Sequence, residues 1–489
     1  MSLNYPVIGK IVGTTLIILG CAMMPSLLVS AVLGETQTIA AFLAAIIPLL
    51  AAGWFLIYRI QPVSNVLKLR DGFLTVALCW IAASLAGAVP YLASGSVSSL
   101  ADAIFESTSG FTTTGATIFN DVEILPRGLL LWRSFSQWLG GMGILVFAIS
   151  LLPALGISGQ IIARAETPGP TLEKMTPKMH DSAKMLYSIY IGLTLLQIVL
   201  LLFGGMSLFD SCIFTFGSVA SGGLTNYNDG TAHFDSPYIE LVISFFTVFA
   251  CVNFSLYYTL GKGRVREFFK DTELRVFLIL LFVSTLLISG DLLAAGTYGS
   301  AGETLRYGFF HATSFITTTG HVTSDLMVWP TFSKFLLLTL SFIGGCSSST
   351  GGAIKVIRVI VLFKLIHRGI YRRLHPRAVV PVKIRGKNIP SDTVSNITAF
   401  VVLYFLVFLF GALILSLEPF DFLTAISASA ATLGNIGSGF GAMGLGGNYA
   451  AFSHWAKLFM SLLMLVGRLE LFTILLLFTP TFWNPDKQY

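Results

Sequence analysis

Ten long apolar stretches limit what this chain can fold into more than any other feature. A helix needs about 20 apolar residues to cross the hydrocarbon core of a bilayer. Charged residues make up only 11 % of the sequence, against roughly 25 % in soluble domains. The predicted spans are residues 7–33, 38–58, 73–93, 129–155, 186–204, 238–260, 274–294, 331–366, 397–417 and 455–480. They predict an all-α polytopic membrane protein, whose first span is expected to be retained rather than cleaved as a signal peptide.

The basic residues indicate which side of the membrane each loop faces. Loops 59–71, 153–184, 261–275 and 364–387 hold 20 of the 30 lysines and arginines. All four lie on one side if every span crosses, and the positive-inside rule makes that side cytoplasmic. Both termini are then expected in the cytoplasm. This placement of basic residues favours membrane lipid over nucleic acid as a partner.

The loops on the opposite side are acidic. Together they hold 13 acidic residues and a single basic one, Arg306. A negative vestibule would concentrate cations, but depletion of basic residues outside also follows from the positive-inside rule alone. Both interpretations stay open for any single acid.

Each outer segment also contains an apolar run of about twelve residues, which is too short to span a membrane. These runs are residues 100–111, 208–219, 305–316 and 420–433. Short helices at membrane depth are tolerated only where protein or a wet cavity surrounds them. We therefore expect four re-entrant helices.

A glycine follows each run and defines an internal repeat. The sequence Thr-Thr-Thr-Gly occurs twice, and two looser copies share its register. The aligned glycines are Gly115, Gly223, Gly320 and Gly437, with a small polar residue two positions earlier in each copy. Repeats of about 100 residues indicate quasi-symmetric architecture. We predict two N-terminal helices in residues 1–71, then four helix–re-entrant loop–helix units in residues 72–180, 181–272, 273–390 and 391–489.

Residue types in the four loops suit an ion filter. A desolvated cation needs carbonyl oxygens in place of water, and glycine reaches left-handed dihedrals that turn successive carbonyls to one face. One such loop is weak evidence because Thr and Gly also serve in helix packing, whereas four in register are strong evidence. The predicted filter residues are Thr112, Thr113, Thr114, Gly115, Ala220, Ser221, Gly222, Gly223, Thr317, Thr318, Thr319, Gly320, Gly434, Asn435, Ile436 and Gly437.

The eighth span is interrupted at residues 344–353 by glycine, serine and other small residues. Such a stretch either permits close helix packing or unwinds at membrane depth. In the second case it would form a flexible barrier below the filter. The predicted gating residues are Gly344, Gly345, Cys346, Ser347, Ser348, Ser349, Thr350, Gly351, Gly352, Lys355 and Arg468.

The two basic residues in that set are candidates for different reasons. Arg468 lies inside the last apolar span, where arginine is costly and is by default a functional candidate. It could instead cap carbonyls of a neighbouring broken helix. Lys355 could equally extend its charge toward the cytoplasm. Glu470, two residues beyond Arg468, is not expected to pair with it.

The whole chain resembles the Trk/Ktr/HKT superfamily of potassium transporters, and within it the bacterial TrkH/TrkG type. The resemblance rests on the four glycines, Ser-Gln-Trp-Leu-Gly-Gly-Met-Gly at 136–143 and Gly-Gly-Cys-Ser-Ser-Ser-Thr-Gly-Gly at 344–352. It implies four degenerate potassium-channel-like units around one central pore. Loops two and four lack the triple threonine, which implies an imperfectly symmetric filter.

The resemblance further implies potassium uptake across the bacterial inner membrane, gated by the loop beside Arg468. The implied partners are a second copy of the chain, in a homodimer, and a cytosolic TrkA-like nucleotide-binding regulatory subunit. Potassium is the expected cargo, with rubidium and sodium as further candidates, and no covalently bound cofactor is expected. The basic loops 164–184 and 364–387 would either anchor to anionic lipid or dock that subunit.

Two other functions remain to be weighed. A sodium- or proton-coupled potassium symporter would need an intramembrane carboxylate, for which Glu470 is the clearest candidate. A membrane enzyme is not expected, because no catalytic or metal-ligand pattern falls in register on the spans. The G-x-G-x-x-G at 439–444 follows no strand and does not indicate nucleotide binding.

Overall fold

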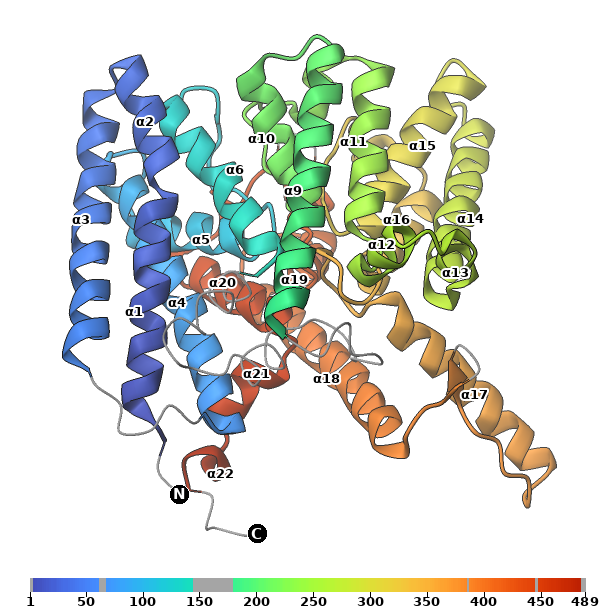
Figure 1. The fold of residues 1–489 in the computed structure, drawn as a ribbon. Coiled ribbons are helices and arrows are strands. Elements are labelled where there is room, and N and C mark those ends of the chain that lie inside the picture. The colour runs from blue at the N-terminus through green and yellow to red at the C-terminus, as the bar shows by residue number, and fades with distance from the viewer. Residues whose placement is uncertain (1–2, 61–66, 144–178, 385–386, 445–446, 485–489) are drawn as a thin grey trace.

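The structure, a computed structural model of the 489-residue chain, describes residues 3–60, 67–143, 179–384, 387–444 and 447–484. Its first three helices form two neighbouring spans beside the rest of the bundle (Figure 1). They are α1 (Tyr5–Ala22), α2 (Met24–Leu33) and α3 (Thr36–Arg59). Helices α1 and α2 make one span kinked near Pro25. A Cβ on Gly53 would lie 2.6 Å from the carbonyl oxygen of Gly13, so small residues permit the close packing of α1 on α3.

Four helical units follow, each with a first helix of 23–25 residues, a re-entrant helix of 12–16 residues and a second helix of 13–15 residues. Units one and two comprise α4 (Leu69–Ala93), α5 (Leu100–Phe111), α6 (Arg127–Gly141), α9 (Met179–Phe203), α10 (Leu208–Val219) and α11 (Pro237–Ala250). Units three and four comprise α14 (Thr272–Ala294), α15 (Ala301–Ile316), α16 (Thr331–Ile343), α18 (Ser391–Leu415), α19 (Phe422–Leu433) and α20 (His454–Arg468).

Further helical elements connect or extend these units. They are η2 (Gly230–Phe234), α12 (Phe254–Gly261), α13 (Val265–Lys270), η3 (Leu326–Val328), α17 (Val356–Leu374), η4 (Gly441–Met443), α21 (Phe472–Leu475), η5 (Leu476–Phe478) and α22 (Pro480–Trp483). A two-residue antiparallel pair, β1 (Lys383–Ile384) with β2 (Lys387–Asn388), follows α17. The predicted all-α architecture is confirmed.

The four re-entrant helices lie where the short apolar runs predict them. Helices α5 and α10 have the predicted bounds. Helix α15 begins four residues earlier than predicted, because Ser300 caps it by accepting a hydrogen bond from the Glu303 amide at 3.1 Å. Helix α19 begins two residues later, because Asp421 accepts from the Thr424 amide. Side-chain capping satisfies free amides at a helix start, and hydropathy alone does not register it.

Two spans predicted as continuous are in fact sharply bent. Helices α11 and α12 meet at 92°, and α20 bends by 114° against residues 472–478. Asn253 caps α12 by accepting from the Ser255 amide at 2.9 Å, while Glu470 and Leu471 both take left-handed backbone conformations. The predicted break between α16 and α17 is present, at residues 344–355, here named the intramembrane loop. The prediction of uninterrupted sixth and tenth spans is therefore wrong.

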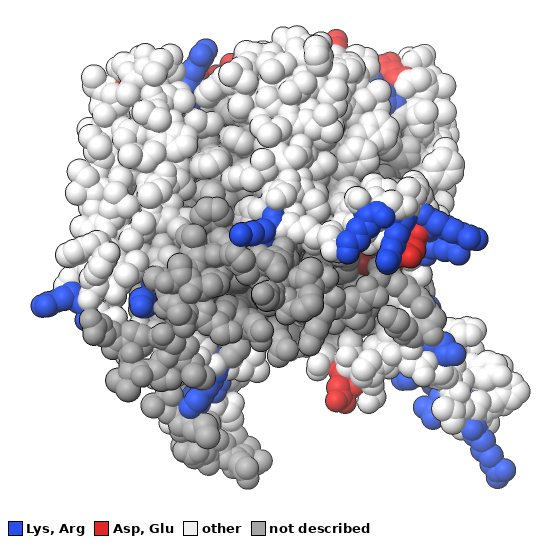
Figure 2. Space-filling view, in the orientation of Figure 1, with Lys and Arg blue, Asp and Glu red and all other residues white. Residues whose placement is uncertain are grey.

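The outer surface of the bundle suits a lipid environment. Long helices expose large apolar side chains such as Ile47, Phe282 and Leu413, each more than 60 % exposed. Figure 2 shows a broad uncharged face, with most lysines and arginines in its lower part. The start of α1 and helix α22 lie at that same end (Figure 1). The described residues contain six helices long and apolar enough to span, or up to eight if each bent pair is one span. The protein is a multi-pass membrane protein.

Candidate functional site

The four loops after the re-entrant helices share one backbone conformation. We name them glycine loops one to four, residues 112–115, 220–223, 317–320 and 434–437. In each loop the residue two before the glycine has φ between +53° and +57°, and the glycine has φ between +74° and +84°. Alternating left-handed residues turn successive carbonyls to one face of a strand. Glycine loops two and four, which lack the triple threonine, adopt the same conformation as the others.

The glycine loops close into a ring in chain order. A Cβ on Gly115 would collide with the carbonyl oxygen of Gly222, which directly precedes the next aligned glycine. The same relationship is repeated from each loop to the next. The remaining collisions join Gly223 to Thr319, Gly320 to Ile436 and Gly437 to Thr114. Loop four therefore meets loop one, and each glycine is required because a neighbouring carbonyl occupies the place of its side chain.

A cavity of about 120 Å³ opens on this ring from the side of the loops that follow each glycine. All four aligned glycines line it, together with His321, Ser438 and Tyr449. Tyr449 Oη donates to the carbonyl oxygen of Gly437 at 2.8 Å. The ring is thus reached from a depression that residues of all four units line.

Threonine hydroxyls brace glycine loops one and three from within. The Oγ1 atoms of Thr112 and Thr114 are 2.8 Å apart, and those of Thr317 and Thr319 are 2.9 Å apart. In loop four, Asn435 Nδ2 donates at 3.0 Å both to Thr114 Oγ1 and to the carbonyl oxygen of Met464. Asn435 therefore replaces the threonine brace with a link to loop one.

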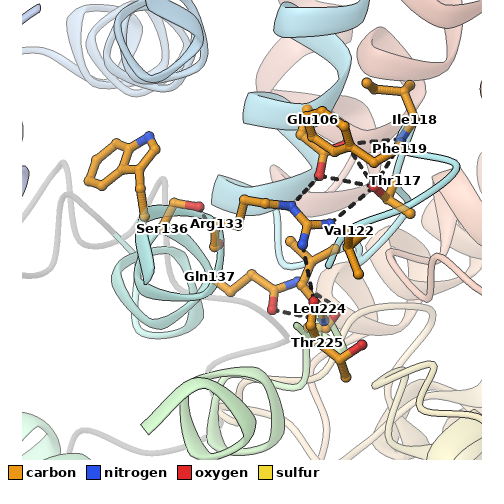
Figure 3. Close-up of polar contacts among 12 residues, drawn as sticks. Glu106, Thr117, Ile118, Phe119, Val122, Arg133, Ser136, Gln137, Leu224 and Thr225 are labelled. Carbon is orange, nitrogen blue, oxygen red and sulfur yellow. Dashed lines mark hydrogen bonds and ion pairs between the residues drawn. The ribbon is translucent and has the colours of Figure 1, made fainter. Parts of the chain in front are cut away.

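A buried ion pair supports the outer side of loops one and two (Figure 3). Arg133 Nε donates to Glu106 Oε1 at 2.7 Å, and both side chains are at most 1 % exposed. Arg133 also donates to Thr117 Oγ1 at 3.0 Å and to the carbonyl oxygen of Thr225 at 3.1 Å. These hydrogen bonds satisfy donors of Arg133 that the ion pair leaves open, as a buried pair requires. The sequence prediction missed this pair, although a charged residue inside each apolar stretch was the signal that could have found it.

The intramembrane loop contacts glycine loops three and four. The Gly352 amide donates to Thr318 Oγ1 at 2.7 Å. A Cβ on Gly352 would collide with the carbonyl oxygen of Gly434. The loop carries four left-handed residues, including Ser348 and Lys355. It therefore lies against the ring, on the side where the re-entrant helices end.

The break between α11 and α12 holds the intramembrane loop in place. The Cys346 amide donates to the Cys251 carbonyl oxygen at 2.9 Å, and the Phe254 amide donates to the Ser348 carbonyl oxygen at 3.1 Å. Glu273 accepts at 2.6 Å from the Ser347 amide and at 2.7 Å from Ser347 Oγ. These bonds satisfy backbone groups that a broken helix leaves open.

Three basic side chains surround the loop. Arg468 donates to the carbonyl oxygens of Thr350, Gly140 and Gly141 at 2.6–2.9 Å. Lys355 Nζ donates to the carbonyl oxygen of Gly351 at 2.5 Å, so the buried lysine points into the loop rather than toward the cytoplasm. Arg358, which the sequence prediction missed, pairs with Glu470 at 2.5 Å. The predicted gating residues thus form one contiguous cluster.

Among the described residues, no group of three or more His, Cys, Asp and Glu side chains could hold a metal ion. The predicted docking loop 164–184 lies largely outside the described residues, as does the end of the predicted span 129–155.

Four re-entrant helices inside an apolar bundle, with their loops closed into one ring, are the architecture of a membrane transport protein. The family described as TrkH, cation transport protein, matches residues 37–484. The chain belongs to the TrkH family of cation transporters.

Two named relatives and one crystal structure are similar over nearly the whole chain. The potassium uptake protein TrkH of Escherichia coli K12 is 37 % identical, over 99 % of this chain and 100 % of its own. TrkG of the same strain is 33 % identical over 95 % of each chain. The crystal structure of the potassium transporter TrkH from Vibrio parahaemolyticus is 36 % identical, with a TM-score of 0.89 over 98 % of this chain and 100 % of its own.

Proposed function

We propose that this protein takes up potassium through the ring of glycine loops, which acts as its selectivity filter. The observation that carries the proposal is the closed order of the ring, in which each glycine faces the carbonyl of the next loop. Carbonyl oxygens replace the hydration shell of a cation in such filters. The names of the relatives, which are potassium uptake proteins, support potassium as the cargo.

The intramembrane loop is the gate in this proposal. It lies against the ring and carries the buried amine of Lys355 together with the guanidinium of Arg468. Positive charge and backbone on the ion path both oppose passage of a cation. Opening then requires the loop to leave the carbonyls and amides that now hold it.

The partners and the location belong to the same proposal. The protein lies in a bacterial inner membrane with both termini in the cytoplasm, forms a homodimer and is regulated by a TrkA-like cytosolic subunit. The gathering of basic side chains in the lower part of Figure 2 supports this orientation. The proposal keeps the division into units at residues 72–180, 181–272, 273–390 and 391–489, although α4, α9 and α14 begin one to three residues before these bounds.

A coupled symporter is the alternative mechanism. Its candidate carboxylate, Glu470, is paired with Arg358 at 2.5 Å, so a coupling ion would have to displace a guanidinium. This pairing favours movement of potassium down its own gradient. Rubidium flux into liposomes, with and without a sodium or proton gradient, separates the two mechanisms. Flux that strictly requires the second gradient would establish symport.

Glycine substitution tests the filter. Gly320→Ala would place a Cβ against the carbonyl of Ile436, whereas Gly290→Ala in α14 meets nothing within 4 Å. We expect Gly320→Ala to lower the ratio of rubidium to sodium flux and Gly290→Ala to leave it unchanged. If both variants had the same ratio of rubidium to sodium flux, the glycine loops would not be the selectivity filter.

A further inference from the structure

Gln137 on α6 reaches glycine loop two, one helical turn beyond Arg133 (Figure 3). Its Nε2 donates to the carbonyl oxygen of Gly222 at 2.7 Å, and its Oε1 accepts from the Leu224 amide at 3.1 Å. The side chain is fully buried. Because one partner can only accept and the other can only donate, the orientation of the side-chain amide is fixed.

Loop two is the only one of the four glycine loops with a second glycine, Gly222, directly before the aligned glycine. The equivalent residues Thr114, Thr319 and Ile436 all carry side chains, and like Gly222 none of them has a positive φ. A Cβ on Gly222 would lie 2.5 Å from Cδ of Gln137. Gln137 therefore fills the space that the residue's own side chain would take, and the glycine is required by the glutamine rather than by the turn.

The Gly222 carbonyl is also a member of the ring, because its oxygen faces Gly115. Among the described hydrogen bonds, the equivalent carbonyls of Thr114, Thr319 and Ile436 receive none from a side chain. Unit four shows what stands at the equivalent place. Gly140 abuts the carbonyl of Phe111 and Gly467 abuts that of Leu433, and each carbonyl lies four residues before the aligned glycine of its loop. Gln137 and Met464 lie three residues before these two helix glycines and therefore correspond. Met464 has no side-chain amide. Among the described hydrogen bonds, therefore, only loop two has a side chain bonded to the carbonyl that directly precedes its aligned glycine.

We propose that Gln137 is a positioning residue that sets the ion preference of the filter. This inference rests on the proposed function. The side-chain amide of Gln137 fixes the position and direction of the Gly222 carbonyl. Gly222 has no side chain of its own that could anchor this carbonyl. One lone pair of the carbonyl oxygen accepts from Gln137, and the second is left for a cation. Selection among cations depends on the number and field of such oxygens.

The test compares two buried glutamines that both donate into unit two. Gln137→Met keeps the length of the side chain but loses both hydrogen bonds. The control is Gln197→Met, because Gln197 is also fully buried yet donates at 2.9 Å to Ser218 Oγ on α10 rather than to a carbonyl of glycine loop two. The readout is the ratio of rubidium to sodium flux in liposomes at matched protein content. We expect Gln137→Met to lower the ratio by about three- to tenfold, the range of one hydrogen bond, and Gln197→Met to leave it unchanged.

A double-mutant cycle keeps the proposal testable if a single variant folds poorly. Gly222→Ala overpacks against Gln137, and Gln137→Ala leaves a void, so each change is expected to lower the yield of folded protein. The combination of both changes removes the collision and should restore yield and rubidium flux above those of Gly222→Ala alone. Its ion ratio should stay low, because the amide is missing.

The outcomes separate this inference from the proposed function. Wild-type vesicles that take up no rubidium contradict the proposed function. Selective wild-type vesicles with an equally selective Gln137→Met variant overturn only the role of Gln137. If the double variant gave no higher yield or rubidium flux than Gly222→Ala alone, the side chains at positions 222 and 137 would not compete for one space. That result would also overturn the role of Gln137.

Discussion

The guanidinium of Arg468 donates to the carbonyl oxygen of Thr350 at 2.9 Å, which joins the end of α20 to the intramembrane loop of another unit. The same side chain holds Gly140 and Gly141 at the end of α6. Units one, three and four therefore meet at one cation. Its removal should release the loop on the side where it contacts the ring.

We expect Arg468→Gln to raise rubidium flux several-fold, because it deletes both a positive charge and most of these donors. Arg358→Gln is the comparison, since Arg358 lies beside the same loop but pairs with Glu470. Flux through purified protein in liposomes is the measurement. Well-folded Arg468→Gln protein with wild-type flux would mean that Arg468 is structural.

Glu273 anchors the loop from α14 and offers a second test. Its carboxylate accepts from Ser347 and, at 3.2 Å, from the Ile357 amide. Glu273→Gln would aim an amide at a backbone donor, at a cost of about 1–3 kcal/mol. We expect a lower melting temperature and a higher basal flux. Glu267→Gln, at an exposed site on α13, should change neither the melting temperature nor the basal flux. If Glu273→Gln also changed neither of them, Glu273 would not anchor the loop.

The Glu106–Arg133 pair should matter for stability more than for flux. Removal of one member leaves a buried charge unpaired and costs about 3–5 kcal/mol. We expect Arg133→Met to lose most folded protein in thermal size-exclusion assays. The Arg133→Met, Glu106→Gln double variant should recover part of it. If the double variant gave no more folded protein than Arg133→Met alone, the ion pair would not be the dominant interaction.

Thr318 tests whether the ring and the loop are coupled. Its hydroxyl accepts from the Gly352 amide, and Thr318→Val removes that acceptor while it keeps the side-chain shape. We expect altered basal flux with little change in melting temperature. Thr113→Val is the matched control, because Thr113 has the same left-handed backbone in loop one. The same flux change in both variants would argue against a specific contact.

The sequence predicts the re-entrant helices and the aligned glycines well, because each leaves a local pattern. Helices α5 and α10 begin and end at the predicted residues. The bends after Ala250 and Arg468 leave no such pattern, because each stretch as a whole is apolar enough for one span although Asn253 and Glu470 lie at the breaks. Bonds to the intramembrane loop, such as that from Cys346 to Cys251, stabilise the first of them. Tertiary contacts of this kind cannot be read from hydropathy.

The role of Gln137 lay beyond sequence reasoning for a related reason. A polar residue in an apolar span was visible, but its partners, Gly222 and Leu224, are 85 and 87 residues away. Only the packed structure brings them together. The order of the ring likewise emerges from contacts between units, whereas the repeat alone gives only their number.

The contact between Gly437 and Thr114 joins the last glycine loop to the first. A ribosome makes loop one long before loop four, so a nascent chain contains three loops with no partner to complete them. In the function that we propose, the ion pathway is complete only when the C-terminal unit inserts. In a truncated copy without that unit, Gly320 lacks the Ile436 carbonyl and Thr114 lacks Gly437, so the ring of glycine loops stays open.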